Sequence, residues 1–164
     1  MPDEGELGTI RRTGETFEAT ITRTFDHDQQ TLWAMLTDPA KLPLWLAPGE
    51  LSLRKGGAAK LNFPESGINV DSVITAIDPP KLIEYSWSSP GQPLRPLRWE
   101  LSPSAGGAVL RLTLRIPDSE DIARTCAGWD CHLDMLAAAL EGIPSKFPFD
   151  RFKAAREAYR AVNT

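Results

Sequence analysis

The segment from Ile122 to Gly142, "IARTCAGWDCHLDMLAAALEG", constrains the fold more than any other part of the chain. Its large apolar side chains recur every three or four residues, at Ile122, Cys126, Trp129, Leu133, Leu136 and Leu140. At about 100° per residue, these positions form a stripe about 80° wide on one face of a helix. Gly142 follows in the place where a left-handed residue commonly ends a helix. The sequence therefore predicts a long helix whose apolar face must be buried against the rest of the chain.

The chain before this helix has patterns that are typical of strands and turns. These patterns form two groups, one before and one after a short helical segment. Residues 16–25 have the period of two that marks a half-buried strand, with apolar positions at Phe17, Ala19, Ile21 and Phe25. We expect a partner strand over residues 7–12 and, later, strands over residues 50–54, 58–63, 68–77, 82–89, 96–103 and 108–116. Between the two groups, Asp28 can cap a helix over residues 29–38, and residues 39–47 form a second short helix or a turn.

Three of the later strands carry apolar rows that face one way. The rows are Ile83, Tyr85 and Trp87, then Leu97, Trp99 and Leu101, then Leu110, Leu112, Leu114 and Ile116. The alternate positions are polar, as at Arg98, Glu100 and Arg111. One apolar face and one polar face indicate an antiparallel sheet that is covered on a single side. The order of elements predicts an α+β fold, with the helix from Ile122 as the cover.

A second, smaller apolar stripe lies on the back of this helix, at Cys131, Met135 and Ala138. A last helix over residues 150–162 has Phe152, Tyr159 and Val162 on one side and could cover this stripe. A second copy of the chain is the alternative cover, and it would make a homodimer.

Composition and charge exclude several classes of protein. The formal net charge is −4 and the isoelectric point about 5.2, and Arg111, Arg115 and Arg124 are too few to form a basic stripe for nucleic acid. No run approaches the roughly 18 apolar residues that a membrane helix requires. The opening segment "MPDEGELGTI" lacks the features of a signal peptide. We therefore expect a cytoplasmic protein.

The two cysteines, Cys126 and Cys131, are expected to stay reduced. On a helix, residues five apart differ by a rise of about 7.5 Å and a rotation of about 140°, whereas a disulfide needs facing side chains and Cα atoms within about 7 Å. The same divergence prevents Cys126, Cys131 and His132 from converging on one metal ion. The sequence also lacks a phosphate loop and a dinucleotide fingerprint, so we expect neither a metal nor a cofactor.

Three segments resemble motifs of START-like proteins: "LTDPAKLPLWLAPGELSLRKGGAAKLNF", "AIDPPKLIEYSW" and "GWDCHLDMLAAALEG". Together they resemble homologues of the Hsp90 ATPase activator, a branch of the SRPBCC (START / Bet v allergen-like) superfamily. The resemblance implies a helix-grip fold, in which a curved antiparallel β-sheet wraps around a long C-terminal helix, with two short helices after the early strands. It also implies a single START-like domain over residues 1–164, with a core over about 7–142 and a helical extension over about 143–164. Arg115 stands where members of this branch often have a histidine, so no role of that histidine carries over.

Folds of this kind usually leave a cavity for an apolar small molecule between the sheet and the closing helix. The residues that we expect to line it are Trp45, Tyr85, Trp87, Trp99, Leu112, Trp129, His132, Leu133 and Leu136. The aromatic members would serve equally well to fill a core. His132 lies at the edge of the stripe, where it either contacts a ligand or anchors a neighbouring strand or loop. Asp134 lies further round the helix and is expected to be solvated.

Binding of a small hydrophobic or aromatic molecule is the leading hypothesis, in a carrier, sensor or stress-related role. The first alternative is a co-chaperone-like domain with a chaperone as its protein partner. The second is a cavity enzyme of cyclase, dehydratase or hydrolase type, for which His132, Tyr85 and Glu100 are the candidate acids and bases. Glu100 belongs to the outward row of its strand, which counts against its use in a cavity.

Overall fold

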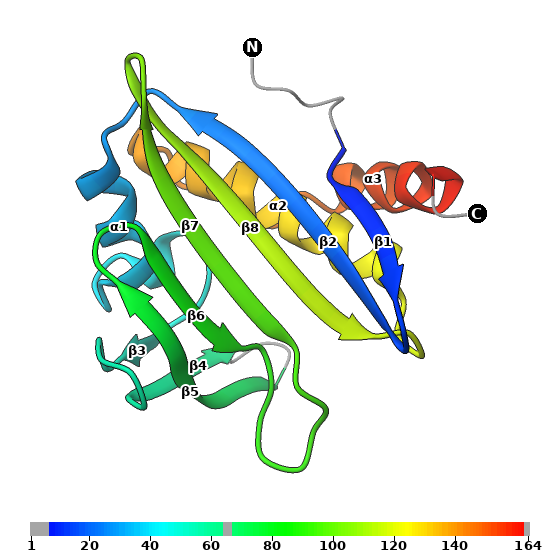
Figure 1. Cartoon of the computed structure of the whole chain (residues 1–164). Helices are drawn as coiled ribbons and strands as arrows, with labels where there is room; N and C mark the ends of the chain where they lie inside the picture. The colour runs from blue at the N-terminus through cyan, green and yellow to red at the C-terminus, as the bar shows by residue number, and fades with distance from the viewer. Residues whose placement is uncertain (1–6, 64–66, 163–164) are drawn as a thin grey trace.

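The computed structural model describes residues 7–63 and 67–162 and shows one antiparallel sheet wrapped around a long helix (Figure 1). The strands of this part of the chain are β1 (Thr9–Thr13), β2 (Thr16–Phe25), β3 (Gly49–Leu51), β4 (Ala58–Phe63), β5 (Ile68–Asp78), β6 (Leu82–Ser86), β7 (Pro96–Ser104) and β8 (Gly107–Pro117). They form a single eight-stranded sheet in the order β1-β2-β8-β7-β6-β5-β4-β3, and each neighbouring pair is antiparallel. The predicted α+β helix-grip fold is confirmed.

The helices also lie where the sequence places them. They are α1 (Gln29–Thr37), the short 3₁₀ helix η1 (Leu42–Leu44), α2 (Ile122–Leu140) and α3 (Phe149–Val162). As predicted, the Asp28 carboxylate caps α1, accepting a 2.8 Å hydrogen bond from the Thr31 backbone N–H. Gly142 adopts the left-handed conformation after α2, with φ of +72°.

Two strands are shorter than the sequence predicts. β3 ends at Leu51 rather than at residue 54, because the backbone turns at once and the Arg54 N–H bonds to the Ser52 carbonyl at 2.7 Å. β6 ends at Ser86 rather than at residue 89, where the Ser86 hydroxyl accepts the Arg95 N–H at 2.8 Å in place of a ladder bond. In both places one backbone bond continues past the strand end, from the Ser52 N–H to the Ala58 carbonyl and from the Trp87 N–H to the Arg95 carbonyl, but the regular ladder stops there.

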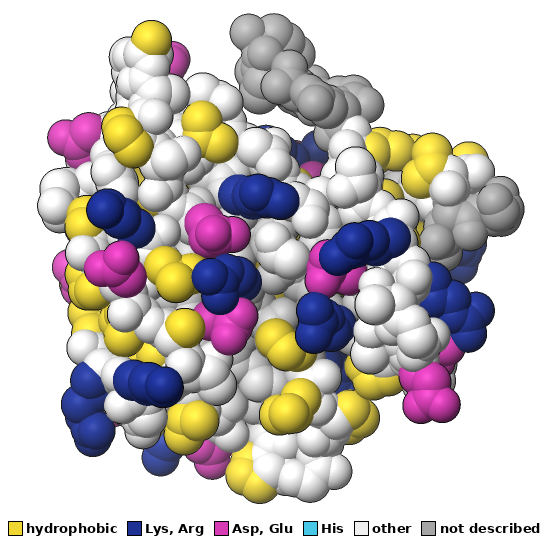
Figure 2. All heavy atoms as spheres, in the orientation of Figure 1, with side chains coloured by type: hydrophobic (Ala, Val, Ile, Leu, Met, Phe, Trp, Pro, Cys, Tyr) yellow, Lys and Arg dark blue, Asp and Glu magenta, His cyan; other side chains and the backbone are white. Residues whose placement is uncertain are grey.

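The inner face of the sheet and the apolar stripe of α2 form the core. All the predicted inward positions of β7 and β8 are buried, and Ile83 and Tyr85 of β6 are no more than 1% exposed. Leu133 and Leu136 of α2 meet them and are fully buried. The outer face, opposite α2, carries acidic and basic side chains that are interspersed (Figure 2). The sheet is therefore covered on one side, as the alternation predicts.

The back of α2 is covered by α3 and by the segment that precedes it. The Cys131 thiol is fully buried and lies 3.8 Å from the Pro148 carbonyl oxygen, as a weak hydrogen bond. Tyr159 of α3 is fully buried as well. The C-terminal segment thus covers the second stripe of α2 at Cys131, as the first of the two predictions has it, while Met135 and Ala138 are half-buried. Cys126 and Cys131 are both free thiols, and burial raises the pKa of Cys131 to about 11.

A buried ion pair connects β2 to α2. Arg23 is 9% exposed and Asp130 is 1% exposed, and Arg23 Nη2 lies 3.0 Å from Asp130 Oδ1. The Tyr159 hydroxyl donates to the other oxygen of Asp130 and accepts the Gly8 backbone N–H at 2.9 Å. Burial and the adjacent Asp130 carboxylate raise the pKa of Tyr159, so its hydroxyl stays protonated and remains a donor. This network joins the first strands, α2 and α3.

The expectation that Asp134 is solvated is wrong. Its carboxylate is 28% exposed and accepts from Arg23 Nη1 at 3.0 Å, while Arg151 of α3 lies 2.5 Å away. The helical wheel placed Asp134 away from the core stripe correctly, but α3 and β2 bring two guanidinium groups to that side of α2.

The described residues contain no helix long and apolar enough to cross a membrane.

Removal of the Tyr159 hydroxyl tests the importance of this network. We expect Tyr159→Phe to lower the free energy of unfolding by about 1–3 kcal/mol, because Asp130 and the Gly8 N–H each lose a buried partner. Urea denaturation measures the change. Tyr85→Phe is the matched control, because that side chain is equally buried and its hydroxyl lies beside the uncharged Trp99. Equal losses in the two variants would mean that the network adds nothing beyond ordinary packing.

Candidate functional site

An aromatic cluster fills the space between α2 and the inner face of the sheet. Trp45, which follows η1, contacts Trp99 of β7 with ring centroids 5.8 Å apart and planes at 88°. Trp99 contacts Trp129 of α2 at 5.5 Å, and Trp129 contacts Trp87 at 4.9 Å. These edge-to-face arrangements are the favoured geometry for aromatic pairs. The four tryptophans that the sequence singled out therefore form one continuous chain of contacts.

This cluster continues from the core to the surface of the molecule. Phe63, at the end of β4, lies 5.8 Å from Trp87 and 6.0 Å from His132. On the other side, the His132 ring lies 5.4 Å from Phe147, and Phe147 lies 5.0 Å from Phe149, whose side chain is 67% exposed. Trp45 and Trp99 are each 1% exposed. One end of the cluster is thus closed and the other reaches solvent.

The two most deeply buried indoles differ in their hydrogen bonding. Trp45 Nε1 donates to the Met35 carbonyl at 2.8 Å. Trp99 Nε1 is buried and has no hydrogen-bond partner within residues 7–63 and 67–162. The Tyr85 hydroxyl lies close to the Trp99 side chain, but not in the geometry of a full hydrogen bond, and burial raises the pKa of Tyr85. The inner end of the cluster therefore contains a neutral hydroxyl and an unsatisfied donor.

His132 provides the polar group at the outer end of the cluster. Its Nδ1 lies 3.0 Å from the Trp45 carbonyl oxygen, and because a carbonyl can only accept, Nδ1 must carry the proton. Burial lowers the pKa of His132 and outweighs the opposing effect of this hydrogen bond, so the imidazole is neutral at pH 7. The alternative in which His132 anchors a neighbouring loop is confirmed.

The remaining predicted site residues lie in the same region. Leu112 of β8 stands opposite Trp99 in the β7–β8 ladder, and Leu133 and Leu136 of α2 are fully buried beside the cluster. Their role in binding a ligand stays a prediction. Phe63 and Phe147 were not predicted as site residues. The sequence places them in "LNF" and "KFPF", at the end of a strand and shortly before the last helix. Glu100 lies on the outer face and forms an ion pair with Arg98 at 3.7 Å, outside the cluster.

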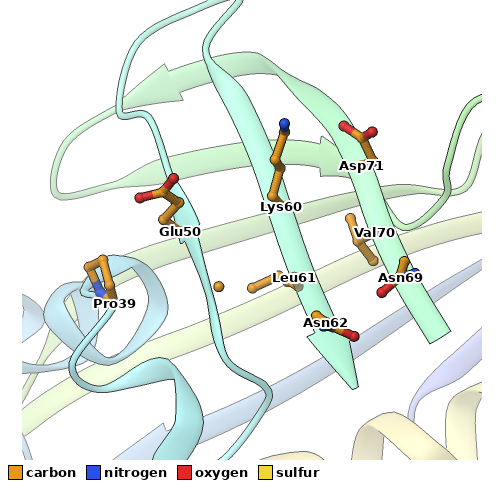
Figure 3. A pocket seen from close by; sticks show the side chains of 9 residues that line it. Pro39, Glu50, Lys60, Leu61, Asn62, Asn69, Val70 and Asp71 are labelled. Atoms are coloured by element: carbon orange, nitrogen blue, oxygen red, sulfur yellow. The ribbon is translucent and has the colours of Figure 1, made fainter. Parts of the chain in front are cut away.

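Two hollows on the surface of the described residues lie away from the aromatic cluster. One of about 490 Å³ is formed around β3, β4 and β5 (Figure 3) and includes Pro39, Glu50, Lys60, Asn62, Asn69 and Asp71. The side chains of Glu50, Lys60 and Asp71 extend together from its strands (Figure 3). The other, of about 640 Å³, lies on the outer face and includes Glu100. No group of three or more metal-ligating side chains is found among the described residues.

Comparisons with known proteins support the resemblance. The family model "Activator of Hsp90 ATPase homolog 1-like protein" matches residues 26–141. The crystal structure of CalU16 from Micromonospora echinospora is 24% identical with a TM-score of 0.75, over 94% of this chain and 93% of CalU16. EF2215 from Enterococcus faecalis, a conserved protein of unknown function, is 20% identical with a TM-score of 0.73, over 94% of this chain and 90% of that protein. DynU16, a protein of the dynemicin biosynthetic locus, is 24% identical with a TM-score of 0.70, over 79% of this chain and 49% of DynU16. No functionally curated protein matches this chain.

The two indoles offer a matched test of the hydrogen bonding in the cluster. We expect Trp45→Phe to destabilise the protein more than Trp99→Phe, by about 1–2 kcal/mol, because only the first substitution leaves a buried carbonyl without its donor. Both substitutions remove the same volume from a fully buried site, so the packing losses largely cancel in the comparison. Denaturant unfolding of both variants measures the difference. A larger loss for Trp99→Phe would show that its N–H is satisfied after all.

The lowered pKa of His132 predicts a pH dependence of stability. The unfolded chain takes up this proton near the ordinary pKa of 6.5, whereas the folded chain does so only at lower pH. Stability from the neutral ring is therefore fully present above about pH 6.5 and is lost as pH falls towards the folded pKa, by at most about 1.4 kcal/mol per pH unit. His132→Asn cannot titrate but keeps an N–H for the Trp45 carbonyl. Between about pH 7.5 and pH 5.5, the parent should lose more unfolding free energy than this variant, and parallel curves would contradict the assignment.

Proposed function

This chain belongs to the family of Activator of Hsp90 ATPase homolog 1-like proteins, and we propose that it binds a small apolar or aromatic molecule between α2 and the inner face of the sheet. The observation that carries the proposal is the Trp99 indole N–H, which is buried among aromatic rings without a partner in the described residues. Buried polar groups in native proteins nearly always have a hydrogen-bond partner, and an exception calls for a specific cause. A ligand with one polar atom among apolar rings would satisfy this donor.

The arrangement of the aromatic rings supports an apolar ligand with access from the surface. Binding sites for small molecules are lined mainly by apolar and aromatic side chains, with few polar groups that fix orientation. Here the polar groups are Trp99 Nε1, the Tyr85 hydroxyl and His132, and the walls are aromatic. Trp87 lies just beyond the end of β6 and is half-buried, so part of its ring is at the surface of the cluster. A ligand would reach the cluster past Trp87 and Phe63.

The alternatives have less support from the site. An enzyme would need an acid and a base together, but Glu100 lies on the outer face, and the protonated Tyr85 hydroxyl and the neutral His132 ring belong to opposite ends of the cluster. Chaperone association rests on the family description alone. Binding without chemical conversion is therefore the function that these residues support best.

Native mass spectrometry of gently purified protein, followed by identification of the released molecule, tests the proposal. We expect a stoichiometric adduct, with occupancy reduced several-fold in Trp87→Ala, because that ring forms the outer wall of the cluster. Trp33→Ala is the control, since Trp33 of α1 is buried but takes part in none of the ring pairs that form the cluster. Equal occupancy in Trp87→Ala and the parent would place the ligand elsewhere. A protein without adduct that also fails to bind added aromatic probes would exclude the proposed function and direct attention to a chaperone partner.

A further inference from the structure

Residues 143–162, which we call the C-terminal arm, consist of α3 and the connection that links it to α2. We propose that this arm is a latch, which detaches from α2 as a unit while the sheet and α2 stay folded. Detachment exposes the thiol of Cys131, which the arm covers. Because it takes place with or without a ligand in the aromatic cluster, this motion goes beyond the proposed function.

The C-terminal arm buries few apolar side chains. Among the 14 residues of α3, only Ala155 and Tyr159 are buried, while Phe152 is half-buried. Phe149 and Val162 are mostly exposed. A helix of this length is marginal on its own in water and depends on apolar burial for its stability. Segments with few buried apolar contacts open at a lower cost than the whole domain, so the arm is the part that separates first.

Two charged contacts join α3 to α2. Arg151 lies 2.5 Å from a carboxylate oxygen of Asp134, and Arg156 donates a hydrogen bond of 2.8 Å to Asp121. The four side chains are between 25% and 40% exposed, so water and salt reach both pairs. Ion pairs of this kind contribute little to stability and are weakened by salt. The arm is therefore attached by contacts that ionic strength can release.

The fold beneath the arm keeps its own connections when the arm leaves. Arg23 of β2 pairs with both Asp130 and Asp134 of α2, at 3.0 Å in each case, and neither contact involves the arm. The arm adds the Tyr159 hydroxyl to this network, and water can replace that donor once the arm is detached. The part of the chain that matches the family, residues 26–141, also ends before the arm. α2 therefore stays aligned with the sheet in the open state.

The connection between α2 and α3 is suited to act as a hinge. Residues 143–148 have no regular secondary structure, and a change of φ and ψ at a few such positions is enough to move a helix. Phe147 lies 5.4 Å from the His132 ring, but its other ring partners, Phe149 and Phe152, belong to α3. Phe147 therefore moves with α3, and detachment separates it from His132.

The two cysteines report on different motions. The Cys131 thiol is fully buried, and it lies against the Pro148 carbonyl of the arm. Cys126 is equally buried, but it belongs to the apolar core between α2 and the sheet. The two positions differ by about 140° around the helix. Detachment of the arm therefore exposes Cys131 alone, whereas unfolding of the whole domain exposes both thiols.

Thiol labelling of the unmodified chain distinguishes these two motions. N-ethylmaleimide is added, the reaction is stopped at successive times, and fragment mass spectrometry assigns the label to each cysteine. We expect Cys131 to react at least about tenfold faster than Cys126. Between about 50 mM and 500 mM sodium chloride, the rate at Cys131 should rise several-fold as the ion pairs of the arm are screened. Equal rates at the two cysteines would overturn the inference, because only the whole domain would then open.

Arg151→Gln tests the role of the ion pairs. Loss of the contact with Asp134 should raise the labelling rate of Cys131 by about twofold to fivefold at low salt. Protection of Cys126 in the same sample shows that the core is still folded. Arg98→Gln is the matched control, because it removes the same charge from an ion pair on the outer face, away from the arm. A rate at Cys131 that is the same in both variants, or that does not respond to salt, would show that these pairs do not hold the arm and that the inference is wrong.

Discussion

The ion pair between Arg23 and Asp130 fixes how α2 lies against the sheet. Both groups are almost fully removed from water, and a buried charge is tolerated only when it is paired and hydrogen-bonded. Rotation of α2 by a single residue would move Asp130 away from β2 and leave both charges unpaired. Because neighbouring residues on a helix differ by about 100°, directing Asp130 towards β2 also directs Trp129 towards Trp87 and Trp99. The placement of the aromatic cluster thus depends on an interaction outside it.

Periodicity predicted most of the fold because each strand and helix has one buried face. The rows of β7 and β8 and the stripe of α2 were identified from spacing alone, and they meet in the core. The same approach missed Arg23, although it occupies an inward position of β2, two residues after Ile21 and two before Phe25. A charged residue in an apolar row looks like an interruption of the pattern until its partner is known. The partner, Asp130, lies more than a hundred positions away in sequence.

The candidate site could be predicted only in part, because identical residues have different roles there. Nothing in the sequence distinguishes Trp45, whose N–H meets the Met35 carbonyl, from Trp99, whose N–H has no partner in the described chain. This difference depends on how the chain after α1 folds back over its last turn. Phe63 and Phe147 join the cluster through connections between elements, where no periodic pattern indicates which way a side chain points.

His132 connects the stability of the fold with the chemistry of the site. Its Nδ1 proton holds the chain after η1 against α2, and this bond, together with contacts to three neighbouring rings, fixes the orientation of the imidazole. Burial lowers the pKa of this ring and so keeps it neutral near pH 7. The proton on Nδ1 is therefore the one that the Trp45 carbonyl requires, and the stability of this contact depends on the burial of the aromatic cluster around it.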